Sequence, residues 1–141
     1  MAESRPKNFE QWQSAVPEVI RRDPLWDYVA YPKALFLYDL AWFDCDHLLK
    51  DVRGRALAAQ LIDAASSISA NMEEGYGKGF GPDYARYLSI ALGSARETRG
   101  WYWRANHLLP PDVVKHRLAL ASEIIALLMT TIPQQRRIKR K

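Results

Sequence analysis

Apolar residues recur at steps of three and four along most of the chain, which is the spacing of one face of an α-helix. This periodicity predicts four helices, over about 32–50, about 52–75, from residue 82 to about 105, and from about 111 to 132. Pro32 and Pro82 suit first helical turns, and Pro110-Pro111 separates the last two helices. Asp51 can cap the second helix and Gly75 can end it. No stretch of strand length alternates with period two, so we expect no strands.

The expected core positions follow the same steps in every helix. They are Leu35, Tyr38, Trp42, Cys45 and Leu49; Leu57, Leu61, Ala64, Ile68 and Met72; Tyr84, Leu88, Ala91, Ala95, Thr98, Tyr102 and Ala105; and Val114, Leu118, Ala121, Ile125, Leu128 and Ile132. Short connections favour antiparallel neighbours. The predicted fold is therefore all-α: an antiparallel up-down-up-down four-helix bundle at 32–132, with an extra N-terminal arm at 1–31 and a basic tail at 133–141.

Two features of the last two helices favour self-association. The last helix carries a second apolar stripe that a lone bundle would leave partly exposed, so either the arm or another subunit should cover it. Trp101 and Trp103 flank the core position Tyr102, and three consecutive helical residues cannot all face one core. The residues of the second stripe are Val113, Leu120, Ile124 and Leu127.

The second and third helices carry small residues where Leu is usual. Ala, Ser and Gly on facing helices allow two backbones to approach closely, which predicts a tightly packed α-hairpin. Gly93 is expected at a close crossing, where a Leu should disrupt the fold. The connection, residues 75–81, is rich in glycine that can supply positive φ. It lacks the third glycine of a dinucleotide fingerprint and the Ser or Thr that follows Gly-Lys in a Walker loop.

The net charge of +4 comes from the end of the chain, because residues 1–135 hold 15 basic and 16 acidic side chains. The last six residues hold five cations, which form either a solvated terminus or a phosphate-binding arm. Three arginines of the third helix can add to such a surface, with a tryptophan for base stacking. The candidate nucleic-acid-binding residues are Arg136, Arg137, Lys139, Arg140, Lys141, Arg96, Arg99 and Arg104.

No catalytic, metal or cofactor site is expected. Asp44-x-x-His47 is the nearest approach to a di-iron motif and has no second copy. The single Cys45 lies in an apolar helical stretch, where it is expected to be a core residue. It also fits a reducing cytoplasm, as does the absence of an apolar signal core near the start and of a membrane span of roughly 18–20 apolar residues.

Two segments resemble a known bacterial family. Residues 60–77 are similar to its segment QLRRAAxSIPANIAEGxGR, and residues 84–97 to its segment FIRFLRIALGSLxEL. Over roughly residues 30–130 the chain thus resembles the four-helix-bundle proteins encoded in 23S ribosomal RNA intervening sequences. The motif residues, for which we expect structural roles in helix packing and in the turn, are Gln60, Ser67, Asn71, Glu74, Gly75, Gly77, Gly93, Ser94 and Glu97.

This resemblance implies a homopentamer without enzymatic activity. It also implies kinship with the accessory protein of diversity-generating retroelements, which binds nucleic acid and a reverse transcriptase. The chain departs from the family pattern where Ile62 and Asp63 replace basic residues and Glu73 replaces a small apolar one. These changes remove positive charge from the second helix and leave the tail as the stronger candidate.

Two functions therefore remain open. The chain is either an oligomeric adaptor that binds RNA or DNA by phosphate contacts, with a reverse-transcriptase-like protein as a possible partner, or a scaffolding oligomer that binds another protein.

Overall fold

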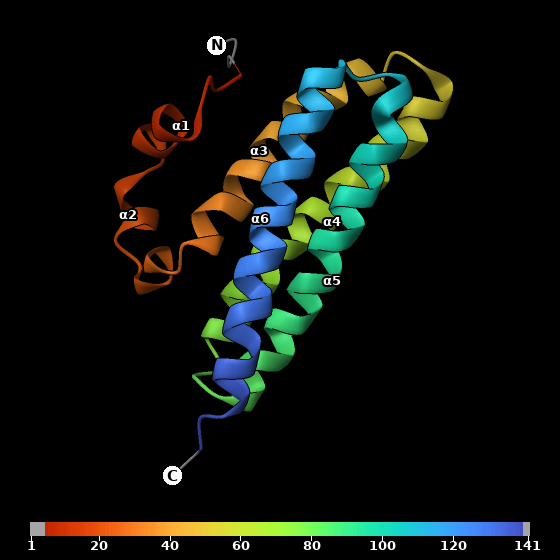
Figure 1. Ribbon diagram of the computed structural model, residues 1–141. Helices are drawn as coiled ribbons and strands as arrows, with labels where there is room; N and C mark the ends of the chain where they lie inside the picture. Colours follow the sequence, from red (N-terminus) through yellow and green to blue (C-terminus); the bar gives the residue numbers. More distant parts are fainter. Residues whose placement is uncertain (1–4, 140–141) are drawn as a thin grey trace.

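The computed structural model describes residues 5–139 and shows the predicted all-α architecture (Figure 1). Four long antiparallel helices form the bundle: α3 (Ala30–Leu48), α4 (Val52–Tyr76), α5 (Pro82–Arg104) and α6 (Pro111–Arg136). A 3-10 turn, η2 (Ala105–His107), extends α5. Helix contacts run from α3 through α4 and α5 to α6 and back to α3. The edge between α3 and α4 therefore lies opposite the edge between α5 and α6.

The N-terminal arm folds onto its own subunit, beside α3 (Figure 1). It consists of α1 (Phe9–Ala15), α2 (Glu18–Arg21) and a 3-10 turn, η1 (Pro24–Asp27). The ring of Trp12 packs against the rings of Phe9, Trp26 and Phe36, and its Nε1 donates a hydrogen bond of 2.6 Å to Asp39. The aromatic residues of the arm thus extend the core over the outer side of α3.

The core positions predicted for α5 are all buried, and those of α4 and α6 are buried or half-buried. In the stripe predicted for α3, Cys45 is buried and Leu35 and Tyr38 are half-buried. The prediction is wrong for Trp42 and Leu49, which are 56% and 49% exposed. The residues of α3 that face the bundle are instead Leu37, Ala41, Asp44 and Leu48, together with their neighbours. Apolar residues lie nearly all round α3, so its periodicity does not select one face.

The close backbone approaches occur at glycines other than the one expected. A Cβ on Gly75 would lie 2.5 Å from the Cβ of Tyr87, and one on Gly54 would lie 2.0 Å from the carbonyl oxygen of Leu48. At Gly93 no heavy atom lies within 4 Å of an added Cβ. The predicted close crossing at Gly93 is therefore wrong, and Gly75 is a packing position within α4 and not its C-terminal stop.

The connection between α4 and α5 uses glycine as predicted, since Gly79 and Gly81 have φ values of 92° and 96°. These values lie in the region that residues with a Cβ rarely adopt. The backbone N–H of Gly81 donates a hydrogen bond of 2.9 Å to the side-chain oxygen of Gln135. The last turn of α6 is thereby fixed to the start of α5.

The second apolar stripe of α6 is covered within the subunit. Ile124 is fully buried and Leu120 is 9% exposed, and Leu127 packs against the same core. The exposed patch that this stripe predicted is therefore not present. Of the two flanking tryptophans, Trp101 is half-buried and Trp103 is 61% exposed.

Candidate nucleic-acid interface

Four basic side chains line the outer edge of the groove between α5 and α6. Arg96 and Arg99 come from α5, and Lys115 and Arg136 come from α6. Positions 96, 99 and 103 follow helical steps of three and four, and positions 115, 122, 129 and 136 repeat every seven residues. Each set therefore lies on one side of its helix.

Contacts across the groove show how the two helices are aligned. A guanidinium nitrogen of Arg136 lies 3.4 Å from the Oγ of Ser89, and one of Arg99 lies 3.2 Å from the Oγ of Ser122. Between them, Arg96 reaches the sulfur of Met129 at 3.6 Å. Because the helices are antiparallel, the cations form a ladder from the end of α6 to the end of α5. We call this surface the basic face; it comprises Ser89, Leu92, Arg96, Arg99, Trp103, Lys115, Leu118, Ser122, Met129 and Arg136.

The basic face contains no acidic residue. Within residues 5–139, none of its four cations forms an ion pair with a carboxylate. Glu97 follows Arg96 directly and so points about 100° away from it around the helix. Glu97 is exposed and forms no ion pair in the described chain. No direct ion pair within the described part of the chain therefore neutralises these four cations.

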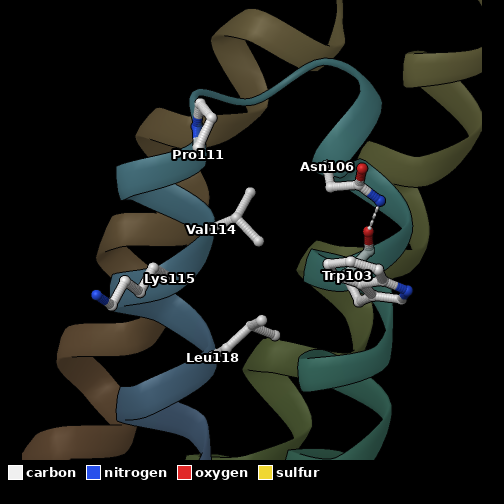
Figure 2. Close-up of a pocket in the computed structure, with 6 residues that line it drawn as sticks. All are labelled: Trp103, Asn106, Pro111, Val114, Lys115 and Leu118. Atoms are coloured by element: carbon white, nitrogen blue, oxygen red, sulfur yellow. Dashed lines mark hydrogen bonds between the residues drawn. The ribbon is translucent and has the colours of Figure 1, made fainter.

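A hollow of about 340 Å³ lies at the Trp103 end of the basic face (Figure 2). Its lining consists of Trp103, Asn106, Pro111, Val114, Lys115 and Leu118. The side-chain amide of Asn106 donates a hydrogen bond to the carbonyl of Trp103, which fixes the end of α5 (Figure 2). The hollow therefore combines an exposed aromatic ring, apolar walls and one ammonium group.

The other predicted binding residues lie in different places. Arg104 lies over the ring of Trp101, 4.7 Å from its centroid, and does not join the ladder. Arg137 and Lys139 are exposed beyond the end of α6, next to Arg136. Arg140 and Lys141 lie outside the described residues. The structure thus brings Arg96, Arg99 and Arg136 together and adds Lys115, which the sequence analysis missed.

The polar motif residues make a hydrogen-bonded contact between α4 and α5. The Oγ of Ser94 donates to the Oγ of Ser67 at 2.8 Å, and the side-chain nitrogen of Asn71 donates to the carbonyl of Ser67 at 2.8 Å. Asn71 therefore bonds within α4 and not to the amides of the glycine-rich turn. Gln60, Glu74 and Gly77 are exposed.

The bundle also contains a buried ionic cluster that joins α3, α5 and α6 and that the sequence analysis did not predict. Asp44 is fully buried and accepts hydrogen bonds from Tyr102, at 2.7 Å, and from two nitrogens of Arg117, at 2.8 and 3.1 Å. Arg5 of the arm adds an ion pair of 3.0 Å. Burial and the neighbouring Asp44 raise the pKa of Tyr102 well above its ordinary value. The sequence contained one indication of this cluster, because Asp44 is a carboxylate within the apolar stretch that forms α3.

The described residues hold few other reactive groups. Burial raises the pKa of the Cys45 thiol to about 11, so it is protonated at neutral pH. Between residues 5 and 139 we find no group of His, Cys, Asp and Glu arranged to hold a metal ion. No helix in that range is long and apolar enough to cross a membrane.

The fold and this face define an all-α four-helix-bundle protein with one basic side. The family model described as "23S rRNA-intervening sequence protein" matches residues 42–130, so the chain belongs to that family, as the motifs in residues 60–77 and 84–97 indicated.

The fold is similar to the crystal structure of a protein of unknown function from the S23 ribosomal protein family of Bacteroides thetaiotaomicron VPI-5482. The TM-score is 0.66 with 23% sequence identity, over 73% of this chain and 97% of that one. This similarity supports the fold alone. No curated protein matches the chain.

Proposed function

We propose that this protein is a non-enzymatic oligomeric adaptor that binds RNA or DNA through phosphate contacts made by the basic face. The observation that carries the proposal is the ladder of Arg136, Arg96, Arg99 and Lys115, none of which forms an ion pair with a carboxylate of residues 5–139. Cations that bind phosphates release the counterions condensed on a nucleic acid, and this release favours binding at low salt.

The size of the face suits a polyanion. From Ser89 to Trp103 it follows α5 for about 21 Å, at about 1.5 Å per residue. A duplex carries one phosphate charge per about 1.7 Å of its axis, so several phosphates fit along this length. Arg137 and Lys139 continue the positive charge past the end of α6. We therefore infer that the body and the tail act together, whereas the sequence alone favoured the tail as the stronger candidate.

The proposal includes self-association, with a homopentamer as the expectation from the family resemblance. Its support is an apolar surface on the edge of the bundle opposite the basic face, where Trp42, Leu49 and Val52 are 56%, 49% and 77% exposed. A subunit contact there would bury these side chains and leave every basic face open to solvent. Repetition of weak sites in one assembly would then raise the overall affinity.

The test is binding of the intact protein to structured RNA and duplex DNA across a salt series. The logarithm of the affinity should fall linearly with the logarithm of salt concentration, at a slope of about −0.9 per phosphate neutralised on a duplex. Arg96→Ala/Arg99→Ala should weaken binding to all sequences and reduce the slope by about 2. The matched control is Arg21→Ala/Arg22→Ala, since both arginines are exposed on α2 of the arm, away from this face.

A truncation separates the tail from the face. It should begin at Lys139, because Gln135 holds the N–H of Gly81 and Ile138 packs beside the same glycine. Binding that survives in this truncation but not in the Arg96/Arg99 variant places the contacts on the bundle. An absence of binding at low salt would refute the proposal. It would favour the second candidate, a scaffolding oligomer whose apolar surface around Trp42 binds another protein.

A further inference from the structure

The hollow at the end of the basic face has the features of a site for a flat, apolar group that carries negative charge nearby. We propose that it holds an unpaired nucleobase stacked on Trp103, so that the preferred ligand is single-stranded nucleic acid or a duplex with an unpaired base. This inference rests on the proposed function and specifies its substrate class.

The first argument is the character of the walls. The Trp103 side chain is 61% exposed, although it lies next to the apolar side chains of Pro111, Val114 and Leu118. Figure 2 shows Trp103 on α5 facing these residues of α6 across the open space. Aromatic rings that are accessible from solvent beside apolar walls are the usual platforms for base stacking.

The second argument is charge complementarity. Lys115 is the only charged group among the six lining residues, and Arg99 lies one helical turn before Trp103 on the same side of α5. A base on Trp103 would therefore carry its flanking phosphates toward Lys115 and Arg99. The side-chain nitrogen of Asn106 donates one of its two hydrogens to the carbonyl of Trp103, and its side-chain oxygen is an acceptor that a base amino group can use.

The third argument is continuity with the ladder. Trp103 and Lys115 lie at the end of the basic face that is farthest from Arg136. A nucleic-acid strand that follows the cations from Arg136 onward therefore ends at the hollow. Bases inside a duplex are stacked on both faces and expose only their edges in the grooves. A stacking platform therefore selects bases that are unpaired and turned out.

The second hollow with an exposed tryptophan lacks this complementarity. It lies between α3 and α4, and its lining includes Trp42, Asp46 and Arg55. Its lining holds one acidic and one basic side chain, so it offers no net positive charge to a phosphate. Trp42 therefore provides a matched control, because it is exposed to nearly the same degree, 56% against 61% for Trp103.

The experiment compares three probes of one length by fluorescence anisotropy: a single strand, a blunt duplex and the duplex with one bulged base. Wild-type protein should bind the single strand and the bulged duplex more tightly than the blunt duplex. Trp103→Ala should weaken binding to the first two probes by roughly tenfold to a hundredfold, as expected for one lost base stack. Its affinity for the blunt duplex should fall much less, because a blunt duplex offers no unpaired base to the ring.

Two further variants identify the cause. Trp103→Phe should retain most of the single-strand affinity because the ring is kept. Trp42→Phe, which keeps an aromatic ring on the surface proposed for the subunit contact, should behave as wild type. Quenching of tryptophan fluorescence by the single strand should be present in wild type and in Trp42→Phe but strongly reduced in Trp103→Phe.

Equal loss of affinity for all three probes in Trp103→Ala would overturn the inference, as would equal wild-type affinity for single strand and blunt duplex. Both outcomes leave the proposed function standing if Arg96→Ala/Arg99→Ala still weakens binding. Wild-type protein that binds none of the probes refutes the proposed function and this inference with it.

Discussion

Replacing Asp44 with Asn tests how the buried ionic cluster holds the bundle together. The carboxylate is fully buried and accepts hydrogen bonds from Tyr102 and Arg117, with an ion pair to Arg5. Asn has nearly the same shape, so the substitution removes the charge without leaving a cavity. It also places an NH₂ group where the surrounding groups are donors.

The expected loss of stability follows from the burial of Arg117, the partner of Asp44. Arg117 is only 6% exposed, so without Asp44 its charge is buried and uncompensated. Removing one partner of a buried ion pair costs about 3–5 kcal/mol. With an unfolding entropy of about 2.1 cal/mol/K per residue, this corresponds to a fall in Tm of roughly 10–17 °C for a chain of this length.

Thermal and urea denaturation followed by circular dichroism measure this effect. Asp46→Asn is the matched control, because it makes the same change in charge at an exposed position on the same helix and should shift the free energy of unfolding by less than about 0.5 kcal/mol. The double variant Asp44→Asn/Arg117→Met should be more stable than Asp44→Asn alone, since it removes the unpaired charge. An Asp44→Asn protein that melts within about 2 °C of wild type would refute the reasoning.

Two further predictions concern glycine packing and tyrosine ionisation. Gly75→Ala should lower the free energy of unfolding by about 1–3 kcal/mol through its clash with Tyr87, whereas Gly93→Ala, which meets open space, should raise it by about 0.4–1 kcal/mol. Chemical denaturation of the two variants measures both changes. Equal effects on the free energy of unfolding would contradict the close contact of α4 with α5 at Gly75. Burial raises the pKa of both Tyr84 and Tyr102, so the stability that their neutral forms contribute is present below pH 10 and lost as pH rises through the folded-state pKa. Absorbance at 295 nm should show tyrosines that ionise only with unfolding; ionisation of all seven before the loss of helical signal would be the opposite result.

Part of the candidate interface was predictable from the sequence. Arg96, Arg99 and Arg136 stood out as basic residues, and Trp103 as an aromatic that the core did not need. The sequence did not show that Arg99 and Ser122, 23 positions apart, meet across one groove. The sequence also provided no reason to separate Arg104 from Arg96 and Arg99. Which side of α5 faces the groove is known only once α6 is placed beside it.

The heptad-like steps and the prolines determined four helices and their order, because local periodicity and backbone constraints depend on residues close in sequence. The family motifs likewise determined membership in the 23S rRNA-intervening sequence protein family. Only the tertiary structure decided which face of α3 is buried, since that helix is apolar nearly all round and its neighbours select the face. The pairing of Asp44 with Arg117, 73 positions away, and the alignment of cations from α5 and α6 were decided in the same way. Both depend on distances between helices, which the spacing of residues along one helix does not contain.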